Sequence, residues 1–124
     1  MTDTATIASA PIIDYADAMD RFDDNDALYR RLAGRFIDDT HLADLQDALE
    51  RNDMEAAYRA AHSLKGVAGN LSFTQLYLIA SILSEALLGG DRATADAWMP
   101  EVKSAHLRVL DALVDLESNA VALA

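Results

Sequence analysis

The stretch MEAAYRAAHSLKGVAGNL, residues Met54 to Leu71, decides the fold of this chain. Its small and aliphatic residues recur at intervals of three and four, the spacing of one face of an α-helix. On a helical wheel at about 100° per residue, the apolar side opposite His62 consists of Ala57, Ala60, Leu64, Val67, Ala68 and Leu71. Asp53 is placed to cap the helix. The pattern predicts a helix that packs on its apolar side and exposes His62.

Helical patterns continue on both sides of this segment. The expected helices are a short one from Ile12 to Met19, one or two from Ala27 to Leu49 with a break near Thr40, one from Ser72 to Leu88, and one from Asp91 to Ser118. Asn25 or Asp26 is expected to be the N-cap of the helix that begins at Ala27. Gly89-Gly90 should end the helix from Ser72 to Leu88. Pro100 should kink or restart the last helix. Amphipathic helices joined by short turns predict an all-α fold, an antiparallel four-helix bundle with a short N-terminal helix.

Length and composition predict one domain. The chain has 124 residues, of which 52% are apolar, enough for a core of its own. We expect residues 1–10 to be a disordered leader, residues 11–118 to form the bundle and residues 119–124 to be a tail. Met1 to Ala10 contains no Lys or Arg, so it lacks the basic region of a secretion signal.

Charge and cysteine content exclude several function classes. The net charge of −11 disfavours nucleic acid as a partner, because the surface would repel a phosphate backbone. The absence of cysteine fits a reducing compartment, and we expect a cytoplasmic protein. The segment Leu71 to Leu88 is mostly apolar, but serine, threonine and glutamine interrupt it, which favours a central bundle helix over a membrane span.

The face around His62 carries the candidate functional residues. Tyr58 and Arg59 lie one turn before it, and Lys65, Gly66 and Gly69 lie one and two turns after it. Each glycine inside a helix costs about 1 kcal/mol relative to alanine. Two glycines beside an exposed histidine suggest that a bulky group or another backbone must approach the imidazole.

These residue types suit phosphoryl transfer. An exposed imidazole is substantially neutral at cytoplasmic pH, so one ring nitrogen has a lone pair for nucleophilic attack. The ammonium of Lys65 could offset the charge of a phosphoryl group on His62, and Arg59 could act from the other side. The chain has no glycine-rich nucleotide loop to hold ATP, so another phosphoprotein is the expected donor.

The run Ala61-His62-Ser63-Leu64-Lys65-Gly66, followed by Ala68-Gly69-Asn70-Leu71, resembles the signature of histidine-containing phosphotransfer (HPt) domains. The resemblance is specific around His62. Over the rest of Ile12 to Leu116 the sequence is compatible with the family pattern; the matching positions are Phe36, Leu45 to Asp53, Leu76, Leu83 and Glu85.

The resemblance implies a phosphocarrier of a multistep phosphorelay, a two-component system. His62 would accept phosphate from a receiver-domain aspartyl phosphate and pass it to another receiver, in response regulators or hybrid kinases. Lys65 would be the charge partner and Gly66 would provide steric clearance. The resemblance also implies no kinase activity, no cofactor and no metal on this chain, since Mg²⁺ would belong to the receiver. We expect a monomer.

Three further positions complete the expected site. Phe73 lies near the His62 side of the wheel if the helix persists, so Phe73, Tyr58, Arg59 and Gly69 are candidates for receiver docking. Ser84 stands where some family members have a glutamine that orients the imidazole. Ser72 is a departure, because the family pattern usually has glycine after Asn-Leu.

Several rival interpretations remain open. The first is a non-catalytic helical scaffolding or interaction module in which His62 has no chemistry. A metal site of His41, His62 and His106 lacks compact ligand spacing, and a hydrolase lacks a nucleophile and base pair, since Ser63 points about 100° away. Within the phosphotransfer interpretation, the alternative is a domain that dimerises and takes phosphate from ATP on a separate catalytic domain.

Overall fold

Helices make up nearly all of the computed structural model, which describes residues 4–123 and the side chains of residues 5–117. In chain order they are α1 (Thr4–Ser9), α2 (Tyr15–Arg21), α3 (Asp26–Gly34), the short 3-10 helix η1 (Arg35–Asp38), α4 (His41–Glu50), α5 (Met54–Asn70), α6 (Thr74–Leu88) and α7 (Arg92–Leu123). The predicted all-α class and the four-helix bundle are confirmed, with further helices at the N-terminus.

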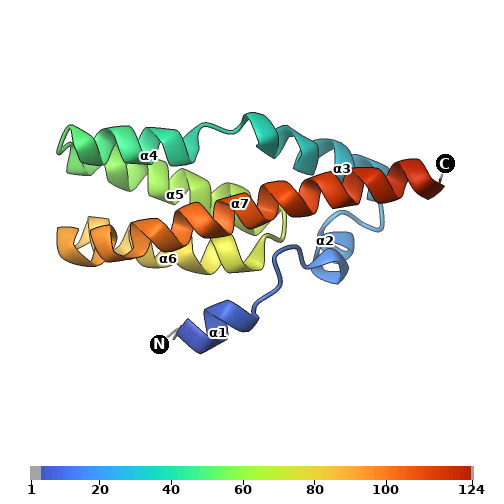
Figure 1. The fold of residues 1–124 in the computed structure, drawn as a ribbon, viewed down its shortest axis with the longest axis horizontal. Helices are drawn as coiled ribbons and strands as arrows, with labels where there is room; N and C mark the ends of the chain where they lie inside the picture. Colours follow the sequence, from blue (N-terminus) through green and yellow to red (C-terminus); the bar gives the residue numbers. More distant parts are fainter. Residues whose placement is uncertain (1–3, 124) are drawn as a thin grey trace.

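The bundle is formed by α4, α5, α6 and α7. Successive helices pack against each other, with α5 between α4 and α6, and α6 against α7. Figure 1 shows that α3 and α4 follow one another along one side of the molecule, and that α7 begins beside α6 and ends beside α3. The break expected near Thr40 is present, since η1 ends at Asp38 and α4 begins at His41.

Local capping explains where these helices begin and end. The side chain of Asn25 accepts a hydrogen bond from the backbone N–H of Leu28, and that of Asp53 accepts one from Ala56, as N-cap residues do. Gly89 follows α6 as its C-cap, and Gly90 has a φ of +73°, which glycine adopts without strain. The predicted caps at Asn25 and Asp53 are therefore confirmed.

The core lies between the helices and contains the face predicted for α5. Ala57, Leu64 and Ala68 are fully buried there. Tyr29 of α3 is also fully buried, and its hydroxyl donates a 2.6 Å hydrogen bond to the carbonyl of Leu71. Burial raises the pKa of Tyr29. This bond ties α3 to the end of α5, the helix that carries His62.

Four expectations about helix boundaries differ from the structure, in whole or in part. Part of the predicted disordered leader forms α1, because Ile7 buries its side chain and its carbonyl accepts a hydrogen bond from the Gln75 amide. Pro100 was expected to kink or restart the last helix; it lies inside a continuous α7, so the restart does not occur. The same helix runs to Leu123, so the predicted tail from residue 119 lies mostly within it. The expected start of α6 at Ser72 is also two residues early.

No helix among the described residues is both long enough and apolar enough to cross a membrane. The apolar segment that begins at Leu71 instead forms most of α6, whose buried side chains face α5 and α7. Leu76, Ile79 and Leu83 are fully buried. The apolar character of this segment therefore reflects its central place in the bundle.

Candidate functional site

The site is built on the outward face of α5. His62 is exposed, while its neighbours Ala61 and Leu64 are buried. A continuous helix of 17 residues fixes the direction of each side chain, so the burial of one side forces the other side outward. The imidazole is thus presented to solvent on a rigid element.

The ring of Tyr58 lies against the imidazole. The two ring centroids are 5.7 Å apart, and the planes are inclined by 27° in a stacked arrangement. Tyr58 is one turn before His62 on α5 and is half-buried. The stack restricts the orientations that the imidazole can adopt.

A surface hollow of about 580 Å³ lies beside His62. It is bordered by α2, by α5 and by the beginning of α6, and it brings together Asp14, Asp17, Arg21, His62, Lys65, Gly66, Ala68, Gly69, Asn70, Ser72, Thr74, Tyr77 and Leu78. The structure therefore places His62, Lys65, Gly66 and Gly69 in one site.

Lys65 borders the hollow and reaches toward α6. Its Nζ lies 5.9 Å from the centroid of the Tyr77 ring, within the range of a cation–π contact. Lys65 is half-buried and is one of the residues that border the hollow. A positive charge is thus available one turn from the imidazole.

The two glycines have different surroundings. A Cβ atom added to Gly66 would have nothing within 4 Å, whereas one added to Gly69 would lie 3.0 Å from Cδ1 and 3.1 Å from Cε1 of Tyr77. Gly69 therefore lies close against α6, and the Tyr77 ring would have to shift by a few tenths of an ångström to admit a Cβ atom there. We expected both glycines to leave space for an approaching partner. Only Gly66 has open space beside it.

Arg59 forms an exposed ion pair on the same helix. Its Nη1 lies 2.7 Å from Oε1 of Glu55, one turn earlier, and it is not among the residues that border the hollow. Exposed pairs of this kind contribute little to stability. Arg59 is thus engaged away from the hollow in this structure.

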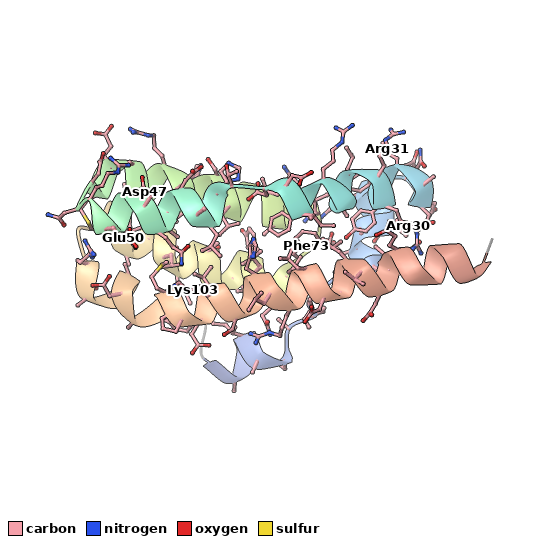
Figure 2. The ribbon with its side chains drawn as sticks, turned by 45° about the horizontal axis from the view of Figure 1, so that its top comes forward. Arg30, Arg31, Asp47, Glu50, Phe73 and Lys103 are labelled. Carbon is pink, nitrogen blue, oxygen red and sulfur yellow. The ribbon has the colours of Figure 1, made fainter. Side chains whose placement is uncertain are left out.

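The expectation that Phe73 lies on the docking surface was wrong. Phe73 has 0% of its surface exposed, and its ring packs edge-on against Phe36 with centroids 5.1 Å apart. Figure 2 shows Phe73 between the helices. The wheel argument failed because α5 ends at Asn70 and the chain reverses at Ser72, whose φ is +60°.

Ser84 is at the level of His62 but faces inward. Helices α5 and α6 are antiparallel, and Gly69 of α5 lies opposite Tyr77 of α6. Ser84 follows Tyr77 by as many residues as His62 precedes Gly69, so Ser84 lies level with His62. The Ser84 side chain is only 5% exposed and does not border the hollow. An orienting role for Ser84 has no support from this arrangement.

Sequence reasoning missed the α2 side of the hollow. Asp14, Asp17 and Arg21 come from a helix more than forty residues before His62, and only tertiary packing brings them there. The one sequence signal for this side of the hollow was serine at position 72, where the family pattern usually has glycine. The Ser72 hydroxyl donates a 2.7 Å hydrogen bond to Asp17 of α2.

The other histidines do not join His62. His41 Nδ1 lies 2.7 Å from a carboxylate oxygen of Asp39, and the His106 ring packs on Phe36. Within residues 5–117 no group of three His, Cys, Asp or Glu side chains is arranged to hold a metal ion. The three-histidine metal site is therefore not formed in this part of the chain.

Fold and site together define a class: helical bundles that present one exposed histidine on a central helix, beside a lysine and a small residue. Residues 35–119, more than half of the chain, match the model of the Hpt domain. The chain belongs to the Hpt domain family. Comparison with curated proteins and with solved structures gave no significant match.

Family membership defines the function in outline. Hpt domains are phosphocarriers, and the family implies a histidine phosphotransfer role in a phosphorelay and interaction with receiver domains. The match begins at Arg35, so α1, α2 and α3 lie outside it.

Proposed function

We propose that His62 accepts a phosphoryl group from an aspartyl phosphate on a receiver domain and passes it to a second receiver. The observation that carries this proposal is the exposed imidazole of His62, which borders a hollow together with Lys65 and the open side of Gly66. No other histidine of the described residues borders this hollow.

The chemistry needs only a nucleophile and a positioned donor. The lone pair of one imidazole nitrogen attacks phosphorus, a P–N bond forms, and the P–O bond of the acyl phosphate breaks, with its electron pair returning to the receiver's aspartate as carboxylate. Transfer to the second receiver reverses these steps on a new carboxylate. Phosphoryl transfer depends mainly on in-line positioning and charge neutralisation.

Each neighbour has a distinct role in this proposal. Lys65 neutralises charge on the phosphoryl group, since it borders the hollow together with His62. Gly66 leaves space for the receiver, because an added Cβ there would point into open space. Tyr58 orients the imidazole by stacking on it. Gly69 acts indirectly, by letting Tyr77 pack beside Lys65.

We further propose that the chain is a cytoplasmic monomer without kinase activity of its own. The sequence has no GxxxxGK[ST] loop that could cradle ATP. The net charge of −11 disfavours nucleic acid as a partner. It favours a protein partner that approaches where cationic side chains lie at the surface.

The proposal is tested by label transfer. Receiver domains from the same genome are phosphorylated with radiolabelled acetyl phosphate and mixed with wild type and with His62→Gln. Acid-labile label on wild type alone supports the proposal. Absence of label on folded wild type, with every receiver tested, would favour the scaffolding interpretation. Dependence of labelling on added ATP and a separate catalytic domain would favour the dimerising alternative.

A further inference from the structure

The hollow beside His62 has one wall that lies outside the family match. Asp14, Asp17 and Arg21 border it from α2 and its N-cap, whereas His62 and Lys65 border it from α5. A partner that reaches the imidazole through this hollow therefore meets α2 as well as α5. The wall from α2 is a feature of this chain that the matched residues 35–119 do not contain.

Ser72 fastens this wall to the helix that carries His62. Its carbonyl accepts a 2.8 Å hydrogen bond from the backbone N–H of Asp14, and its hydroxyl donates one of 2.7 Å to Oδ2 of Asp17. Ser72 is only 3% exposed, whereas the side chain of Asp17 is 43% exposed, so the bond between their side chains is partly shielded from water. These two hydrogen bonds join the turn after α5 to the start of α2.

The backbone at Ser72 shows why serine is informative at this position. Its φ of +60° lies in the left-handed region, which glycine adopts freely and which costs other residues roughly 1 kcal/mol or more. Serine accepts this conformation here although the family pattern usually has glycine. What serine adds is the hydroxyl, and the hydroxyl holds Asp17.

Asp17 in turn positions Arg21. The oxygen that accepts from Ser72 also lies 2.8 Å from Nε of Arg21, one turn later on α2. These two hydrogen bonds, first from Arg21 and then from Ser72, lower the pKa of Asp17, which keeps it ionised. The side chain of Arg21 is 50% exposed, so its guanidinium is accessible at the rim of the hollow.

The position of His62 at the same hollow, with cationic side chains beside it, identifies the occupant. An aspartyl phosphate on a receiver is anionic, and a chain of net charge −11 repels it at long range. Lys65 of α5 and Arg21 of α2 place two cationic side chains at the hollow, beside the carboxylates of Asp14 and Asp17, the second of which is paired with Arg21. We propose that α2, fastened by Ser72, forms part of the receiver-docking surface and that Arg21 contacts the receiver there.

The inference rests on the proposed function and adds a contact to it. It predicts that Arg21 affects how tightly the receiver docks and not the chemistry at His62. Rim charges act mainly on association rate and salt dependence. Arg21→Gln should therefore raise the KM for phosphoreceiver about threefold to tenfold with little change in kcat, and should flatten the dependence of kcat/KM on salt.

Two further variants separate docking from folding. Ser72→Gly removes the hydroxyl and relieves the backbone strain, so it should raise KM like Arg21→Gln while Tm stays equal or rises. Arg31, on α3 (Figure 2), borders a different surface depression. Arg31→Gln removes the same charge there and should leave KM unchanged.

The experiment measures initial rates of label transfer from a receiver domain phosphorylated with acetyl phosphate, over a range of receiver concentrations. Raised KM in Arg21→Gln and Ser72→Gly, with Arg31→Gln equal to wild type, supports docking on α2. Equal KM in wild type, Arg21→Gln and Ser72→Gly would overturn this inference and leave the phosphocarrier role intact. A wild type that accepts no label would overturn both.

Discussion

Tyr58 and His62, one turn apart on α5, stack their rings with centroids 5.7 Å apart. The contact limits rotation of an imidazole that is otherwise exposed. Packing on the surface of α5 therefore helps to orient the nucleophile. A surface histidine without such a neighbour would lack this restraint.

Removal of this stack should slow transfer at saturating receiver. Tyr58→Ala frees the imidazole, and because an aromatic pair contributes about 0.5–1.5 kcal/mol, we expect kcat to fall about twofold to tenfold. Tyr58→Phe keeps the ring and should transfer like wild type. Single-turnover rates measure the effect, and equal rates in Tyr58→Ala and wild type would show that the stack does not orient His62.

Lys65→Ala should lower the transfer rate about tenfold, because charge-assisted contacts contribute roughly 1.5–3 kcal/mol when well formed and less when exposed. The helix should remain intact, since alanine favours helices. Transfer rate, phosphohistidine half-life and Tm are measured together. A normal rate and a normal half-life would assign Lys65 to its contact with Tyr77 alone.

Gly66→Gln should separate stability from transfer. The new side chain meets nothing within 4 Å in the folded protein, and it replaces glycine inside a helix, so stability should rise by up to about 1 kcal/mol. The same side chain projects into the space reserved for the receiver and should slow transfer more than tenfold. A variant that is more stable and transfers normally would contradict the clearance role.

Acid should weaken the fold through His106. Its Nε2 is buried without a hydrogen-bond partner among the described residues, and burial lowers the pKa of His106, opposed in part by Asp39. The unfolded chain therefore binds the proton more readily. The contribution of neutral His106 to the free energy of unfolding is fully present above the ordinary histidine pKa of 6.5. This contribution is lost as the pH falls through the lower pKa of His106 in the folded protein.

The measurement is the free energy of unfolding between about pH 7 and pH 5. His106→Leu keeps an apolar contact with Phe36 and should show a shallower decline than wild type. His62→Gln, altered at an exposed histidine, should decline like wild type. Equal slopes in His106→Leu and wild type would rule out His106 as the source.

The sequence predicted the directions of side chains on α5, because one continuous helix determines them. Tyr58, His62, Lys65 and Gly66 keep the relative directions expected from the wheel, because α5 is regular over its length. Asp53 and Asn25 cap as expected, since capping depends on residues within one turn.

Prediction failed where tertiary contacts decide. Phe73 lies beyond the end of α5, so its direction depends on the turn at Ser72 and on packing against Phe36. Gly69 lies close against Tyr77 on the next helix. The α2 wall is held by contacts across more than fifty residues of sequence, which periodicity in one segment cannot reveal.

The most direct measurement mixes the folded protein with a receiver domain that carries radiolabelled aspartyl phosphate, with His62→Gln as the matched control. We predict acid-labile label on wild type, its loss to a second receiver added later, and no label on His62→Gln. Equal labelling of the two proteins would contradict His62 as the acceptor, and no labelling of wild type by any receiver would contradict the phosphocarrier role.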